Sequence, residues 1–182
     1  TQNTLRIVKV FWALDANLSR RRHFPAINWL QSYSLYMAQL NDYYDEKVSP
    51  EWNKLRSWFM EVLQKEAELQ EIVQLVGSDA LPEAEQITIE VARMIRELFL
   101  QQNGFDPVDT YCSLDKQLDM FKMIKTYADL AYAAQAAGIP PVQILAVKAK
   151  NEMPQIKFTK EYKPVLDKIY SEMDAEFKAL RA

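Results

Sequence analysis

The residues best suited to ligand chemistry in this sequence lie between positions 20 and 36, where a run of arginines is followed by His23, Phe24 and Pro25. Arginine is suited to bidentate phosphate contacts, and an aromatic ring on a stiff X-Pro turn offers a flat apolar face. The stretch could be a nucleic-acid patch, the edge of a domain, or one wall of a pocket for a flat, anionic ligand.

The charge of the chain argues against the first alternative. The 182 residues carry a formal net charge of −3, and acids and bases are mixed along the chain. No long-range field then selects a polyanionic partner, so we expect no nucleic-acid partner. The length fits one domain, or one domain plus a piece of another.

A self-contained catalytic site is also disfavoured. The three glycines are followed by Ser78, Phe105 and Ile139, whereas a phosphate-binding GxxxxGK[ST] loop needs a glycine directly before lysine. His23 is the only histidine, which makes a His-rich metal site or a Ser-His-Asp triad hard to build. We therefore predict no catalytic and no metal-binding residues in this chain.

Cysteine usage and hydropathy indicate the compartment. Cys112 is the only cysteine and cannot form an internal disulfide, and the sequence shows neither a signal peptide nor an apolar run long enough to span a bilayer. These features predict a soluble protein of a reducing compartment.

The first element expected to position these residues is a strand. The stretch 5–14 is β-branched, aromatic and almost continuously apolar, which predicts a strand buried on both faces. Its partners are expected elsewhere. Because the chain starts at Thr1 without an initiator methionine, we interpret it as a fragment.

From residue 49 onward the apolar spacing is that of helices. The predicted helices run from Ser49-Pro50 to Gly77, from Pro82 to just before Asn103-Gly104, from Ser113 to Gly138, from Pro140-Pro141 to near Lys150 and from Thr159 to Ala182. The apolar stripe of the first comprises Trp52, Leu55, Phe59, Val62, Leu63, Leu69, Val73 and Val76. The prediction is a mainly α fold, a helical bundle on a β-containing stub.

Several long motifs carry a family resemblance. Residues 10–15 (VFWALD), 21–29 (RRHFPAINW) and 32–36 (SYSLY), followed by 101–106 (QQNGFD) and 108–113 (VDTYCS), closely resemble the catalytic A subunit of archaeal-type and vacuolar-type rotary ATPases. The matching region is the junction between its nucleotide-binding domain and its C-terminal helical domain. The resemblance covers essentially the full chain, although the last helices add little beyond helical character.

This resemblance implies a division of labour. Residues 1–35 would be the tail end of the nucleotide-binding domain, and residues 36–182 the C-terminal helical domain. The phosphate loop, the catalytic glutamate and the Mg²⁺ site would lie upstream, so this chain alone would be inactive. The intact subunit would bind ATP and ADP, alternate with B subunits in a ring, contact the central-stalk rotor and couple ATP synthesis or hydrolysis to proton or sodium transport. It would belong to the cytoplasmic head, peripheral to the membrane and not inserted in it.

The resemblance also implies an adenine site. Phe24-Pro25 would pack against the adenine ring, and the opposite wall would be the loop of Gln102, Asn103, Gly104 and Phe105, with Val108 and Tyr111 behind it. Gln102 or Asn103 could hydrogen-bond the base edge, and Gly104 would allow close approach of the backbone; many relatives have alanine there. Two structural alternatives stay open: Phe24 plugs a domain edge, and Asn103-Gly104 caps a helix.

The arginine run also has alternatives. Arg20, Arg21 and Arg22 either reach phosphates or form a solvated loop or an inter-subunit salt bridge.

The turn between the first two long helices is acidic. Ser78, Asp79, Glu83 and Glu85 look like the counterpart of the loop through which catalytic subunits touch the rotor. A helix of about 25 residues would carry motion from the adenine pocket over roughly 35–40 Å. The same carboxylates could merely stabilise a helix N-terminus electrostatically.

A different class of function remains the alternative for the whole chain. It is a stand-alone helical protein-interaction scaffold, which ranks ahead of an independent enzyme.

Overall fold

The computed structural model describes residues 2–182, and within this range helices dominate. The elements are α1 (Gln2–Ile7), β1 (Val10–Phe11), α2 (Ala16–Arg20), β2 (Tyr33–Ser34), α3 (Met37–Lys47), α4 (Trp52–Val76), α5 (Glu83–Met94), α6 (Leu114–Ala136), α7 (Pro141–Ile144), α8 (Gln155–Phe158) and α9 (Lys163–Leu180). Three 3-10 turns, η1 (Ser78–Ala80), η3 (Asp109–Tyr111) and η4 (Ala149–Asn151), and a π-helix, η2 (Ile95–Leu100), complete them. The predicted mainly α fold with a short β stub is confirmed.

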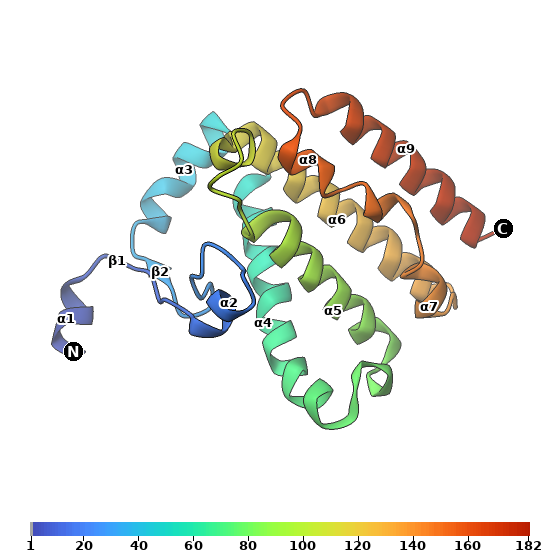
Figure 1. Cartoon of the computed structure of the whole chain (residues 1–182), viewed down its shortest axis with the longest axis horizontal. Helices are drawn as coiled ribbons and strands as arrows, with labels where there is room; N and C mark the ends of the chain where they lie inside the picture. The colour runs from blue at the N-terminus through green and yellow to red at the C-terminus, as the bar shows by residue number, and fades with distance from the viewer. Residues whose placement is uncertain (1) are drawn as a thin grey trace.

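The bundle is built around a long helical hairpin. α4 and α5 run antiparallel and meet at a tip far from both termini (Figure 1). α6 packs on α5, and α9 packs on α6 at the outer side of the bundle. The segment with α7 and α8 runs between α6 and α9, while α2 lies beside α4 and the β1–β2 ribbon lies farther out, towards α1 (Figure 1). The α4–α5 hairpin is called the arm below, and its tip is the turn between the two helices.

Aromatic side chains hold the base of this arm. Phe121 of α6 contacts Trp52, Phe59 and Phe99, with ring centroids 5.0, 4.5 and 4.3 Å away. Trp52, Phe59 and Phe121 are at most 5% exposed. Because these rings come from α4, η2 and α6, burial and ring packing fix the three helices to one another.

Three of the predicted helix ends follow local chemistry. Ser113 caps α6, because its side chain accepts a hydrogen bond from the Lys116 amide. Gly138 ends the same helix with a φ of +89°, and Gly77 ends α4 with a φ of +84°. Both glycines adopt a conformation that costs other residues free energy.

The predicted strand over residues 5–14 is wrong. The structure has α1 there, followed by a strand of only two residues, whose Val10 and Phe11 pair antiparallel with Ser34 and Tyr33. Trp12 is 69% and Leu14 86% exposed, so the stretch is not buried on both faces. A two-stranded ribbon offers no second layer to cover such side chains. Thr1 and the side chains of residues 2, 5 and 6 lie outside the described part of the chain.

The first two predicted helices also differ from the structure in detail. α4 begins at Trp52 rather than at Ser49, although the Ser49 hydroxyl accepts a hydrogen bond from the Glu51 amide. Its apolar stripe is buried only as far as Leu69, because Val76 is 61% exposed near the tip. The second helical run ends at Leu100, just before Asn103-Gly104 as predicted, but it changes after Met94 from α-helix to the π-helix η2. The sequence does not predict the helix α3, because none of its side chains is buried and its apolar pattern is weak.

The fourth and fifth predicted helices are shorter than expected. α7 stops at Ile144, and the amides of Lys148 and Ala149 each donate a 2.8 Å hydrogen bond to the Glu176 carboxylate. This tertiary contact takes backbone donors that a continuing helix would use. α9 starts at Lys163, with Pro164 in its first turn, rather than at Thr159.

Candidate functional site

The two segments predicted to flank a ligand lie together. The backbone amide of Gln102 donates a 2.8 Å hydrogen bond to the carbonyl of Phe24. Phe24 is 51% and Phe105 100% exposed. The structure thus joins the Phe24-Pro25 turn, whose peptide bond is cis, to the loop 101–113 that follows η2, and both leave an aromatic ring open to solvent.

Asp109 organises this loop. Its Oδ2 accepts a 2.7 Å hydrogen bond from the Asn103 amide, and its backbone carbonyl accepts a 2.7 Å bond from Gln102 Nε2. Asn103 Oδ1 in turn accepts a 3.0 Å bond from the Phe105 amide. The side chains of Gln102 and Asn103 therefore hold the loop with one polar atom each.

The other predicted loop residues have mixed environments. Val108 is half-buried, while Tyr111 is 86% exposed. Gly104 has no positive φ, and a Cβ built on it would meet no atom within 4 Å. Gly104 is not a helix cap either, because η2 ends at Leu100 and Gln101 occupies the cap position. The helix-cap interpretation of Asn103-Gly104 is therefore wrong.

His23, directly before Phe24, is buried at 8% exposure and packs on Trp29, with ring centroids 5.6 Å apart. Burial lowers the pKa of His23, and Arg96, Arg21 and Lys157 lower it further by charge repulsion. The neutral imidazole is therefore the favoured form, and it packs on the Trp29 ring.

The arginine run lies on the surface. Arg20, Arg21 and Arg22 are all exposed, and Arg22 has a φ of +57°. Arg21 lines a hollow of about 220 Å³ beside Glu66 and Arg96. The exposure fits the solvated loop, while a phosphate contact and an inter-subunit salt bridge stay predictions.

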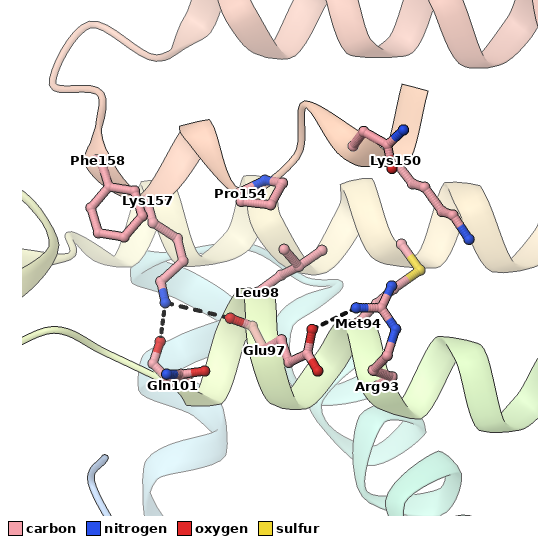
Figure 2. Close-up of a pocket in the computed structure, with 10 residues that line it drawn as sticks. Arg93, Met94, Glu97, Leu98, Gln101, Lys150, Pro154, Lys157 and Phe158 are labelled. Atoms are coloured by element: carbon pink, nitrogen blue, oxygen red, sulfur yellow. Dashed lines mark hydrogen bonds and ion pairs between the residues drawn. The ribbon is translucent and has the colours of Figure 1, made fainter. Parts of the chain in front are cut away.

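Behind the loop, η2 meets α8. Lys157 Nζ donates hydrogen bonds to the carbonyls of Gln101 and, at 3.4 Å, of Glu97, and Figure 2 shows its side chain reaching down to both. The same ammonium lies 3.6 Å from Asp109 Oδ2. Arg93 and Phe158 are among the side chains around the pocket of about 460 Å³ that lies between η2 and the segment 150–158 (Figure 2).

No sequence pattern indicated the Asp109 and Lys157 pair. Asp109 is 4% and Lys157 6% exposed, although both residue types are normally solvated. Their sequence neighbours follow no periodic pattern that would mark a buried charge. Only the tertiary arrangement of the loop against α8 reveals them.

The acidic tip of the arm is exposed at Ser78, Asp79 and Glu83 and half-buried at Glu85. Ser78 Oγ donates a 3.3 Å hydrogen bond to Asp79 Oδ1, and Gln135 donates a 3.3 Å bond to Glu83 Oε2. Glu83 and Glu85 lie in the first turn of α5, where their negative charges interact favourably with the positive end of the helix dipole.

Apolar side chains surround this tip. Ile72, Leu75 and Val76, in the last turns of α4, are 45%, 84% and 61% exposed. Exposed apolar side chains next to charged ones are typical of protein-contact surfaces.

Residues 2–182 contain neither a metal-binding cluster nor a membrane span. No group of three or more His, Cys, Asp or Glu side chains among them could hold a metal ion. In the same range, every helix is too short or too polar to cross a bilayer.

The geometry defines a helical module with an exposed aromatic loop at one end and an acidic tip at the other. The family model described as "C-terminal domain of V and A type ATP synthase" matches residues 41–139, and the chain belongs to this family.

Curated relatives match the chain over nearly its whole length. It is 93% identical over 182 residues to the A subunit of the A-type ATP synthase from Methanocorpusculum labreanum, covering 100% of this chain and 31% of that protein. It is 74% identical over 182 residues to the corresponding A subunit from Methanoregula boonei, again with 100% and 31% coverage. For the A subunit from Methanosarcina mazei, identity is 54% over 180 residues, with 99% and 31% coverage. The chain thus spans 31% of the length of these relatives.

Proposed function

We propose that this chain supplies the adenine wall and the rotor-contacting arm of the catalytic A subunit of an A-type ATP synthase. The complete subunit would bind ATP and ADP, with Mg²⁺ and the phosphates held by an upstream domain. It would form a ring with B subunits in the soluble head of a complex that transports protons or sodium ions. This chain alone would lack ATPase activity.

The observation that carries the adenine wall is the hydrogen bond from the Gln102 amide to the Phe24 carbonyl. It brings together two segments that the family resemblance places on opposite sides of one base. The rings of Phe24 and Phe105 are open to solvent, as a stacking surface requires. Gln102 Nε2 and Asn103 Oδ1 form hydrogen bonds within the loop. The second polar atom of each amide, Gln102 Oε1 and Asn103 Nδ2, is suited to hydrogen-bonding the edge of the base.

The N-terminal apolar surface fits the same proposal. Trp12 and Leu14 are among the most exposed large apolar side chains, and exposing them costs free energy unless another layer covers them. An upstream nucleotide-binding domain is the layer we expect, with residues 1–35 as its last segment.

The arm is proposed to contact the central-stalk rotor through Ser78, Asp79, Glu83 and Glu85. The 25 residues of α4 span roughly 37 Å at 1.5 Å per residue. A small rotation at the adenine end would therefore displace the tip by several times as much as its base. The exposed apolar turn at Leu75 and Val76 would add contact area that carboxylates alone lack.

The adenine wall is tested in the full-length subunit with Phe24→Ala and Phe105→Ala. Loss of one stacking partner, worth about 1–3 kcal/mol, should weaken ATP binding about 5- to 150-fold. The matched control is Tyr43→Ala on α3, since Tyr43 is exposed to the same 51% as Phe24. Calorimetric titration that finds parental ATP affinity in both phenylalanine variants would refute the proposal.

The rotor contact is tested in the assembled complex by replacing Asp79, Glu83 and Glu85 with the corresponding amides. ATP hydrolysis should continue, while ATP-driven ion transport per ATP should fall. The control replaces three exposed carboxylates outside the tip, those of Glu161, Asp167 and Asp174. Equal coupling in the two triple variants would argue against a rotor contact at the tip.

A further inference from the structure

We infer that Asp109 and Lys157 are positioning residues that hold the loop 101–105 against the Phe24 turn, so that the adenine wall is formed before nucleotide binds. The inference rests on the function proposed above and names the residues on which the shape of that site depends.

Asp109 holds the loop at two points. Its carboxylate Oδ2 accepts a 2.7 Å hydrogen bond from the Asn103 amide, and its backbone carbonyl accepts a 2.7 Å hydrogen bond from Gln102 Nε2. The position of Asp109 is itself fixed, because Asp106 Oδ1 accepts 2.8 Å bonds from the Val108 and Asp109 amides. Asn103, Gly104 and Phe105 are all exposed, so packing does little to hold them.

Lys157 fixes Asp109 to the bundle. Its ammonium lies 3.6 Å from Asp109 Oδ2 and donates to the carbonyls of Glu97 and Gln101, at the end of η2. The Lys157 carbonyl accepts a 3.0 Å bond from Lys116 Nζ of α6. The Lys157 side chain thus joins α8 to the π-helix and to the loop, and Figure 2 shows its contacts with Glu97 and Gln101.

The burial of this pair separates it from ordinary surface ion pairs. The side chains of Lys157 and Asp109 are only 7% and 5% exposed, and charges at such sites are costly unless they are paired and hydrogen-bonded. Burial lowers the pKa of Lys157, while Asp109 opposes that shift. Removing either partner would leave the other charge uncompensated, so the loop should relax rather than keep its geometry.

A loop that is already ordered before binding increases nucleotide affinity. If the loop had to become ordered on binding, the entropy cost of ordering it would reduce the binding free energy. The cost falls only on ligands that contact the loop. A ligand held by phosphates alone should be insensitive to Asp109, whereas a merely structural role would weaken every ligand together through a smaller folded fraction.

The test titrates the full-length subunit by calorimetry with MgATP and, separately, with magnesium tripolyphosphate, which lacks the base. Asp109→Ala and Lys157→Met should each weaken MgATP binding about tenfold, the equivalent of ~1.4 kcal/mol, and leave tripolyphosphate affinity within about twofold. Asp109→Asn keeps an acceptor for the Asn103 amide and should recover part of the loss. The double variant Asp109→Asn with Lys157→Met removes both charges, and it replaces any single variant that fails to fold.

The matched control is Glu90→Gln, which breaks the pair of Glu90 with Lys150, whose side chains are 14% and 15% exposed, away from the loop. It should leave both affinities unchanged.

The inference is overturned if MgATP affinity in the Asp109 and Lys157 variants stays within about twofold of the parent, or if the affinities for MgATP and for tripolyphosphate fall together. If Phe24→Ala and Phe105→Ala weaken MgATP binding in the same assay while these variants do not, only the positioning inference fails. If none of these variants weakens it, the adenine wall itself is wrong.

Discussion

The ion pair between Glu66 of α4 and Arg96 of η2 should stabilise the packing of these two helices. Arg96 Nη2 lies 2.9 Å from Glu66 Oε1, and Arg96 Nε donates a 3.1 Å hydrogen bond to Glu66 Oε2. The geometry is bidentate, which is the stronger form of an arginine–carboxylate contact. Glu66→Ala would leave the guanidinium without this partner.

The expected magnitude follows from burial. Breaking a buried pair by removing one partner typically costs about 3–5 kcal/mol. The side chains of Arg96 and Glu66 are 20% and 8% exposed, so water partly replaces the lost partner of Arg96. We therefore expect Glu66→Ala to lower the free energy of unfolding by about 2 kcal/mol, which for a chain of this size lowers Tm by roughly 4–8 °C.

Guanidinium denaturation of the parent, Glu66→Ala, Arg96→Met and the double variant isolates the pair. The cycle should give an interaction energy of about 1–2 kcal/mol. Asp174→Asn serves as the control, because its pair with Lys178 is exposed at 62% and 75% and should contribute little. Additive losses in the double variant would refute the reasoning, since they would show that the two side chains do not stabilise each other.

Three further predictions concern stability. Phe121→Ala removes the ring shared by the aromatic cluster and should cost about 3–5 kcal/mol, measured by the same denaturation. Gly77→Ala forces alanine to a φ of +84° and should cost about 1–3 kcal/mol, whereas Gly104→Ala should stay within about 0.5 kcal/mol; equal losses would contradict the conformational argument. Because the pKa of His23 is lowered in the fold, the unfolded chain binds its proton first, and stability should fall as pH drops below about 6.5. In His23→Gln this decline should be shallower, and identical pH profiles would contradict the assignment.

Local chemistry predicted those parts of the fold that depend on neighbouring residues. Ser113 and Gly138 mark the ends of α6 because a side-chain cap and a left-handed glycine act within one turn. The strand predicted over 5–14 was wrong because its apolar run has no covering layer within the described residues, and Leu14 instead faces solvent. Continuous apolar character predicts burial but does not identify what provides it.

Tertiary contacts decided what the sequence could not predict. The helix predicted through Lys150 breaks where the Glu176 carboxylate binds the Lys148 and Ala149 amides. The family resemblance implied that Phe24 and the loop at Gln102 flank one site, but no local pattern could supply the hydrogen bond between them. The same holds for Asp109 and Lys157, whose contact depends on how α8 packs against η2.

The most direct test of the adenine wall is a structure of the full-length subunit with bound ADP. We predict the adenine ring between the Phe24 turn and the loop 102–105, with its centroid about 4.5–7 Å from that of the Phe24 ring. Adenine bound at another surface, with the rings of Phe24 and Phe105 still open to solvent, would contradict this prediction.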